Sequence, residues 1–255
     1  MLPNSSATGS AEPTLARSLR TPIRRRSFFL YAGATAGATA LVLAGCSKDA
    51  PTALVPSLPA GNTTNADNSI NLGAGDVGVL NFAYALEQLE ADFYSKVVAL
   101  PNGAALLGGA TFAAFQQVAK HEAIHRDFLK AAITRDASSQ VLRALTPKYP
   151  ALTFTDSTNI LATAKAFEDL GVAAYNGAGK LLKTPAYLVI AGQIVSVEAR
   201  HAAFVRNLLV PGSFAADDQV DSLGLDKSMK PMEVLAMAQG FITEKLDGSN
   251  VGVNQ

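Results

Sequence analysis

Two short segments of the chain repeat the same pair of potential metal ligands, a glutamate followed three residues later by a histidine. The first segment is Glu122-Ala123-Ile124-His125, and the second is Glu198-Ala199-Arg200-His201. Residues three apart lie on one face of a helix, so each pair can direct a carboxylate and an imidazole towards the same point. These ligand types suit iron and manganese, and zinc also accepts them. The sequence therefore predicts a metal site to which two helices contribute.

Each of these helices follows another predicted helix with a glutamate near its middle. Ala85-Leu86-Glu87-Gln88-Leu89 matches Ala166-Phe167-Glu168-Asp169-Leu170, and a tyrosine lies seven residues after each glutamate, at Tyr94 and Tyr175. The chain thus contains an internal duplication, and its inward-facing acidic groups need compensating cations because burying a carboxylate without a partner costs several kcal/mol. The predicted ligands of two metal ions, iron or manganese with zinc not excluded, are Glu87, Glu122, His125, Glu168, Glu198 and His201.

Helical periodicity of apolar residues predicts the elements that position these groups. Five helices are expected, at about residues 76–99, 111–133, 156–182, 185–209 and 231–243. In an antiparallel helix pair, residues equidistant from the turn lie at the same height. Glu168 and Glu198 are equidistant from Lys183, next to the Thr184-Pro185 turn, and Glu87 and Glu122 are equidistant from the loop after Pro101. All six side chains can therefore converge on one layer midway along a bundle.

One glutamate from each of two helices, with Glu-x-x-His from each of two others, is the ligand pattern of ferritin-like dimetal proteins. The predicted fold class is therefore all-α: a ferritin-like four-helix bundle with a crossover connection between helices two and three, plus a short C-terminal helix. Over about residues 76–210 the chain resembles the ferritin-like domain family of exported bacterial proteins, which includes desiccation-related proteins. The resemblance implies that the six residues occupy the dimetal ligand positions. It implies no particular reaction, because members of this fold range from iron stores to oxidases, peroxidases and catalases.

The N-terminal part has the composition of a targeting segment and a linker. Arg25-Arg26-Ser27-Phe28-Phe29 resembles the twin-arginine export signal, and Leu43-Ala44-Gly45-Cys46 resembles the bacterial lipobox, in which cleavage precedes an acylated cysteine. Cys46 is the only cysteine of the chain, so an intramolecular disulfide cannot form. Residues 1–45 are predicted to be a twin-arginine lipoprotein signal peptide, 46–75 a disordered tether and 76–255 the ferritin-like helical domain.

The protein is expected to be exported and attached to a membrane by lipid on Cys46, where it faces the periplasm or the cell exterior. The formal net charge is zero and no basic face stands out, so a nucleic-acid partner is not expected. A homo-oligomer stays open. The leading hypothesis is a dimetal carboxylate protein of the bacterial envelope that handles metal ions, dioxygen or peroxide. The alternative is a non-catalytic envelope stress or desiccation-related bundle whose site is structural or empty.

A minor alternative comes from the segment His121-Glu122-Ala123-Ile124-His125, which matches the zinc-protease helix motif H-E-x-x-H. In that hypothesis the two histidines bind zinc and Glu122 is the general base. It leaves Glu198 and His201 without a role, and the sequence has no convincing strands. In the dimetal hypothesis His121, one residue away from the inward-facing Glu122, is expected near the surface.

Three further residues have open roles. Glu90 lies one turn after Glu87, and Gly171 stands at its counterpart position in the second half. It is an extra ligand, an acceptor next to the ligands, or a solvated or ion-paired side chain. Tyr94 and Tyr175 lie two turns after Glu87 and Glu168. The two tyrosines could be core residues without a further role, redox-active groups, or donors of hydrogen bonds to ligands.

Overall fold

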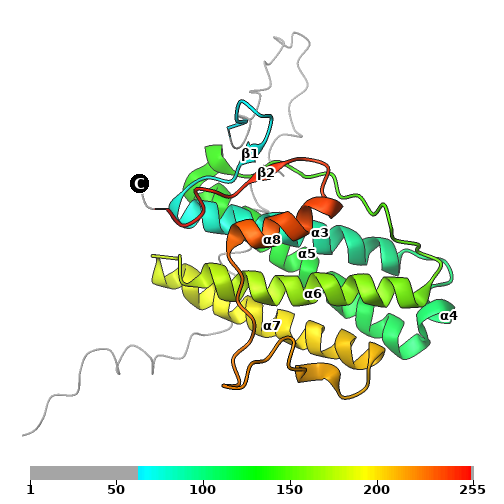
Figure 1. Cartoon of the computed structure of the whole chain (residues 1–255). Helices are drawn as coiled ribbons and strands as arrows, with labels where there is room; N and C mark the ends of the chain where they lie inside the picture. The colour runs from blue at the N-terminus through cyan, green and yellow to red at the C-terminus, as the bar shows by residue number, and fades with distance from the viewer. Residues whose placement is uncertain (1–62, 254–255) are drawn as a thin grey trace, which may run out of the picture. The chain divides into compact units, whose positions relative to one another are not determined.

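A computed structural model of the chain describes residues 63–253 (Figure 1). The predicted signal peptide, Cys46 and the predicted tether as far as residue 62 lie outside the described residues. Four long helices dominate the described part, and they confirm the predicted all-α bundle. They are α3 (Gly75–Val98), α5 (Gly109–Ala137), α6 (Ser157–Gly179) and α7 (Pro185–Leu209).

Local sequence signals account for several helix boundaries. The side chain of Asp156 accepts hydrogen bonds from the backbone N–H groups of Thr158 and Asn159, which caps the first turn of α6. Pro185 occupies the first turn of α7, where its missing N–H group has no helical partner to lose. A short helix that the sequence did not predict, α4 (Gly103–Leu107), lies in the loop between α3 and α5.

The connections give the bundle two distinct ends. The Asp76 carboxylate, at the start of α3, accepts hydrogen bonds from the backbone N–H groups of Lys183 (2.7 Å) and Thr184 (2.8 Å) between α6 and α7. The start of α3 and the α6–α7 turn therefore lie together, and we call this the turn end of the bundle. The opposite end, where α4 joins α3 to α5, is called the α4 end (Figure 1).

The predicted crossover between α5 and α6 runs along α3 and is fastened by polar side chains of that helix. Buried Asn81 donates through Nδ2 to the carbonyl of Gln140 (2.8 Å) and accepts through Oδ1 from the N–H of Leu142 (2.9 Å). Two turns further along α3, Gln88 Oε1 accepts a hydrogen bond from the N–H of Leu145 (2.8 Å). These bonds satisfy backbone groups that have no helix or sheet partner, which is what a buried connection requires.

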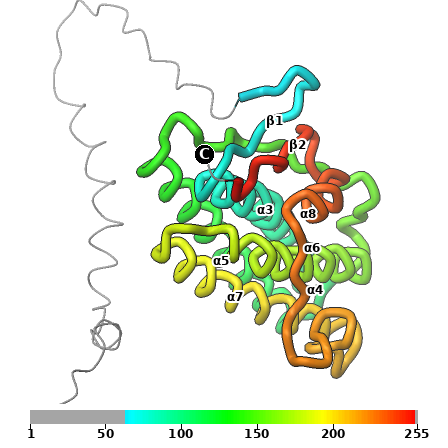
Figure 2. Tube along the Cα trace, turned by 60° about the vertical axis from the view of Figure 1, so that its left-hand side comes forward, coloured from blue at the N-terminus to red at the C-terminus, as the bar shows by residue number. Residues whose placement is uncertain are grey.

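The folded domain starts earlier than the sequence predicted. Residues 63–75 were expected to be the end of a disordered tether, but Ile70 and Leu72 are 1% and 0% exposed. Strand β1 (Ile70–Asn71) pairs in parallel with β2 (Leu246–Asp247), and the two strands lie side by side next to α3 (Figure 2). The segment has few apolar residues, but it finds its partners in a distant part of the chain, which local composition cannot reveal.

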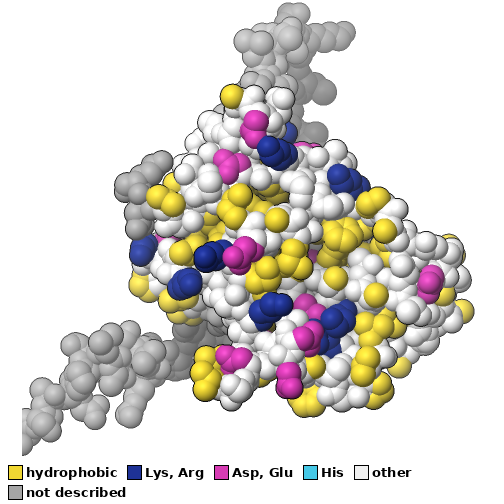
Figure 3. Space-filling model, viewed as in Figure 1, with side chains coloured by type: hydrophobic (Ala, Val, Ile, Leu, Met, Phe, Trp, Pro, Cys, Tyr) yellow, Lys and Arg dark blue, Asp and Glu magenta, His cyan; other side chains and the backbone are white. Residues whose placement is uncertain are grey.

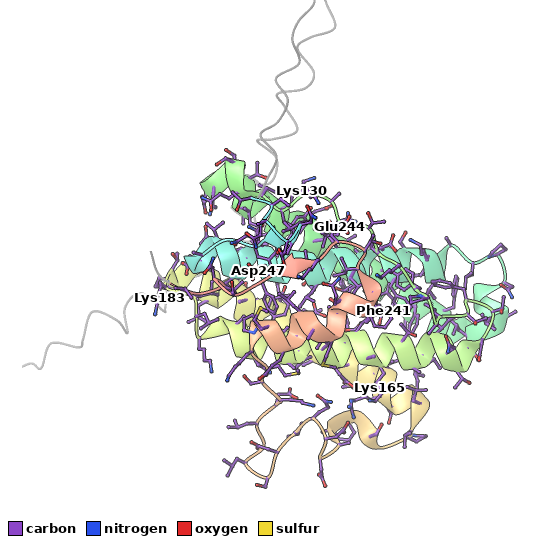
Figure 4. The ribbon with its side chains drawn as sticks, turned by 45° about the horizontal axis from the view of Figure 1, so that its top comes forward. Lys130, Lys165, Lys183, Phe241, Glu244 and Asp247 are labelled. Atoms are coloured by element: carbon purple, nitrogen blue, oxygen red, sulfur yellow. The ribbon has the colours of Figure 1, made fainter. Side chains whose placement is uncertain are left out.

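The C-terminal segment covers one face of the bundle. Helix α8 (Pro231–Ala238) continues into the 3-10 helix η3 (Gln239–Phe241), so the regular helix is shorter than the predicted span of 231–243. The Phe241 ring packs edge-to-face on Phe167 of α6, with 4.8 Å between ring centroids. Figure 4 shows Phe241 and Asp247 on this segment, which lies across α3 and α6.

Within residues 63–253, α7 is the one helix that is long and apolar enough to cross a membrane, judged by length and composition, with a mean hydropathy of 1.3 over its most apolar window. It is nevertheless a bundle helix, because Glu198 and His201 on α7 are buried in the interior. On the face shown in Figure 3, acidic and basic side chains are interspersed among apolar ones.

Candidate metal centre

The structure brings all six predicted ligands into one layer inside the bundle. Their ligand atoms form two overlapping groups, in each of which all atoms lie within 4.8 Å of one another. Glu122 and Glu198, one on α5 and one on α7, belong to both groups. The two groups are Glu87, Glu122, His125 and Glu198, and Glu122, Glu168, Glu198 and His201.

The first group is centred on His125 of α5. Its Nδ1 lies 2.7 Å from Glu198 Oε1, 3.5 Å from Glu122 Oε2 and 3.6 Å from Glu87 Oε2. The three carboxylates come from three helices, so the imidazole is surrounded by acidic groups that the chain brings together only on folding. The carboxylates of the first group are all fully buried.

The second group repeats this geometry with the helices exchanged. His201 Nδ1 lies 2.9 Å from Glu122 Oε1, 3.5 Å from Glu168 Oε2 and 3.6 Å from Glu198 Oε2. The internal duplication of the sequence therefore becomes an approximate two-fold relation between the two groups. Glu122 and Glu198 exchange places under it, and each offers one oxygen to each histidine.

The hydrogen bonding of these groups tests whether they fit metal ions. Across the described residues, eight buried side-chain polar atoms have no hydrogen-bond partner, and all eight belong to the six predicted ligands. The shortest contacts, from His125 to Glu198 and from His201 to Glu122, have suitable lengths but not the direction of a hydrogen bond. Buried polar atoms are otherwise nearly always paired. The ring nitrogens and carboxylate oxygens thus point at common centres rather than at one another, as ligands of a cation do.

Proton binding shows how strongly the layer attracts positive charge when it holds no metal ion. Burial lowers the pKa of His125 and His201, but the carboxylates close to each ring outweigh it and raise both to about 12. Burial raises the pKa of Glu168 to about 8, and burial together with the neighbouring Glu198 raises that of Glu87 well above its usual 4.5. Protons therefore partly neutralise the layer, and metal ions would have to displace them.

Two tyrosines hold the outer carboxylates in place. Tyr94 Oη on α3 donates to Glu168 Oε1 on α6 (2.5 Å), and Tyr175 Oη on α6 donates to Glu87 Oε1 on α3 (2.5 Å). Each of these glutamates thus has one oxygen fixed by a tyrosine and one oxygen without a hydrogen-bond partner. Of the roles left open by the sequence, the hydrogen-bond donor is the one that the geometry supports.

His121 lies on the surface, as expected, but it also contacts the site. Its Nδ1 is 3.0 Å from Nε2 of His201, and the two rings are stacked with an angle of 6° between their planes. If His201 binds a cation through Nδ1, its Nε2 carries the proton and donates it to His121, which fixes the orientation of the ring. The sequence did not reveal this contact, because the two residues are on different helices.

Glu90 is neither solvated nor part of the two ligand groups. It is 4% exposed, and burial together with the nearby carboxylates raises its pKa well above the usual value. Its side chain occupies the space left by Gly171, where an added Cβ would lie 3.0 Å from Glu90 Oε1. The glycine at the counterpart position is thus what makes room for the extra carboxyl group.

Comparison with known proteins agrees with this geometry. The model of the ferritin-like domain family matches residues 75–211, which cover α3 to α7. The chain belongs to the ferritin-like domain family. A search of curated proteins found no match. In this ferritin-like domain the zinc-protease hypothesis loses its basis, because His125 shares its ligand group with three glutamates and His121 lies in neither group.

Proposed function

We propose that the chain is a dimetal carboxylate protein that binds two ions of iron or manganese and acts on metal ions, dioxygen or peroxide. The observation that carries this proposal is the set of eight partnerless buried polar atoms, all directed into one layer. Four buried carboxylates without compensating cations would be strongly destabilising. Two overlapping ligand groups that share Glu122 and Glu198 support two ions rather than one.

Each ligand has a distinct role in this proposal. Glu87 and His125 would serve one ion, Glu168 and His201 the other, and the two shared glutamates would bridge them. When bound, the ions would supply Lewis acidity and, for iron or manganese, electrons for redox chemistry. The chain itself excludes bulk water from the layer, since the four glutamates are fully buried. Its tyrosines, Tyr94 and Tyr175, orient the two outer carboxylates.

Metal analysis of the full chain and of matched histidine variants tests the proposal. Wild type purified without added metal is expected to hold about two equivalents of iron or manganese. His201→Ala should lower this content and the thermal stability measured with metal present, because bound metal adds to folding stability. His121→Ala is the comparison variant. It removes an imidazole that is not itself a ligand, so it should still bind both ions, with weaker binding only of the ion at His201.

Two outcomes would contradict the proposal. A protein that binds no metal, and whose thermal stability does not change with a chelator, would be the non-catalytic bundle with an empty site. A single zinc ion that is lost in His121→Ala and kept in His201→Ala would revive the protease hypothesis. Bound metal without turnover of peroxide or dioxygen would leave the site structural and remove the catalytic part of the proposal.

We further propose that the protein works outside the cytoplasm on a lipid anchor at Cys46, exported by the twin-arginine route. Support comes from the sequence around Arg25-Arg26 and around the sole cysteine, Cys46. That route exports folded proteins, so the metal layer could be loaded before export. Cys46→Ser should abolish labelling with a radioactive fatty acid and move the protein from the membrane to the soluble fraction. Unchanged partitioning into detergent would contradict the anchor.

A further inference from the structure

A cavity of about 60 Å³ lies inside the bundle between the metal layer and the turn end. All four long helices contribute to its walls, which are almost entirely apolar. Among the residues that line it, Arg135 is the single charged one, and Tyr175 and Tyr187 carry the other polar side-chain atoms. The apolar walls include Val79, Ala83, Leu86, Leu129, Ala174, Ala178, Ala191 and Ile194.

The inner end of the cavity lies against the metal layer. Ala83 is one turn before Glu87 on α3, and Ile194 is one turn before Glu198 on α7. Tyr175 lines the cavity and donates a hydrogen bond to Glu87, so a single side chain separates the space from a ligand. The liners of α3 extend over about two helical turns towards the turn end, which makes the cavity about 10 Å long at about 1.5 Å per residue.

The outer end of the cavity faces solvent. The α3 liners are all buried, whereas Tyr187 and Ala191 on α7 are half-buried and Arg135 at the end of α5 is exposed. The Arg135 guanidinium pairs with the neighbouring Asp136 carboxylate, and Tyr187 also contacts that carboxylate. The mouth of the cavity is therefore polar, and its interior is not.

The internal duplication shows that this space is not a necessary result of the fold. In the register that superposes Glu87 on Glu168 and His125 on His201, three of the small liners of the cavity correspond to larger side chains at the α4 end. Phe93 corresponds to Ala174, Val97 to Ala178 and Phe115 to Ala191. These larger residues are 0% exposed and fill the equivalent space beyond the other half of the metal layer.

We propose that the cavity binds an aliphatic chain with a carboxylate head group, with its tail towards the metal layer and its head at Arg135. An empty cavity of this size lowers stability, so the small residues point to an occupant. Water is a poor one, because each buried water needs two to four polar partners. A slender apolar chain matches the lining, and its volume beyond 60 Å³ requires the half-buried side chains at the mouth to shift. A carboxylate left at the mouth keeps its hydration and meets Arg135, where it competes with Asp136. The nearness of the tail to metal ions rests on the proposed function.

Calorimetric titration of the full chain with octanoic acid tests this inference. The chain carries Cys46→Ser, so that no acyl group of the predicted anchor competes for the cavity. Saturable binding with a negative heat-capacity change is expected, since apolar surface is buried. Octan-1-ol should bind more weakly, because it has no charge to interact with Arg135.

Variants that copy the filled end provide the decisive comparison. Ala191→Phe and Ala178→Val should weaken octanoic acid binding by about tenfold or more. Ala131→Phe, on the exposed face of α5, is the matched control and should bind like the parent. Metal content and thermal unfolding of each variant are measured alongside. Both variants are expected to fold and to keep the metal content of the parent, so that a loss of binding reports the filled cavity.

The outcomes separate this inference from the proposed function. Absence of saturable binding to the parent chain, or equal affinity in both filled variants, would overturn it even if the protein holds its metal ions. Binding that persists in a chain without any metal affinity would keep the cavity as an acyl-chain site and overturn the dimetal proposal instead. Stronger binding of octan-1-ol would overturn the head-group assignment to Arg135.

Discussion

The two ends of the bundle are built from the same repeated sequence but close the metal layer differently. At the α4 end, the rings of Phe93, Tyr94 and Phe115 pack edge-to-face, with centroids 5.0 to 5.3 Å apart. At the turn end, two of the equivalent positions are Ala174 and Ala191, and a cavity remains. The ligands and the tyrosines that hold them are the same in both halves. The six predicted ligands and the two tyrosines are thus related by the two-fold repeat, whereas the packing at the two ends differs. One end of the layer is closed and the other is accessible.

The largest expected effect comes from making the closed end resemble the open one. Phe115→Ala places at the α4 end the residue type that Ala191 has at the turn end. Because the Phe115 ring is fully buried among aromatic neighbours, the change should lower the free energy of unfolding by about 3–5 kcal/mol. Urea unfolding of the full chain measures this as a lower midpoint with an unchanged slope.

The reverse substitution is the control for that experiment. Ala191→Phe adds a ring where space already exists, so its effect on the free energy of unfolding should stay within about 1–2 kcal/mol. Similar large losses for both variants would mean that the two ends are equally well packed. The comparison between a closed and an open end would then be wrong.

A smaller difference is expected between the two tyrosine hydroxyl groups. Tyr94→Phe removes the donor to Glu168 in a fully packed region, which leaves a buried oxygen without a partner and should cost about 1–3 kcal/mol. Tyr175→Phe removes the equivalent donor to Glu87, but this residue borders the cavity, where the Glu87 carboxyl group has room to shift. Its cost in urea unfolding should be clearly lower. A larger cost for Tyr175→Phe would show that the cavity does not let Glu87 relax.

The smallest effect concerns the histidine that contacts only one half of the site. In the register of the duplication, Val197 corresponds to His121, so the stack of His121 on His201 has no counterpart at His125. His121→Ala should weaken binding of the ion at His201 by about tenfold and leave the ion at His125 unchanged. Competition with a chromogenic chelator resolves the two affinities. Equal weakening of both, or no change, would remove His121 from the set of orienting residues.

Much of the bundle, and the convergence of the six predicted ligands, were accessible from the sequence, for physical reasons. Four glutamates and two histidines on apolar stripes are too costly to bury unless cations compensate them. Pro185 marks a helix start because it lacks a backbone N–H group, and Asp156 does so because its side chain caps backbone N–H groups. Asn81 and Gln88 were not recognised, because a polar residue that holds a crossover looks like a surface residue in a sequence. The difference between Ala174 and Phe93 was visible in the sequence. Its meaning required the structure, which shows that Ala174 lines a cavity whereas Phe93 packs among aromatic rings.

The pairing of β1 with β2 has a consequence for the order in which the protein is completed during synthesis. Ile70 lies ahead of all four bundle helices in the chain, but its partner Leu246 follows them all. A nascent chain can assemble the four-helix bundle while the segment before α3 still has no partner strand. That segment can dock only after residues 245–247 have left the ribosome, because Ile70 and Leu72 donate their N–H groups to Lys245 and Asp247. The segment before α3 can therefore dock only after the whole bundle has been translated. A protease that cleaves this segment when it is undocked would distinguish nascent from finished chains.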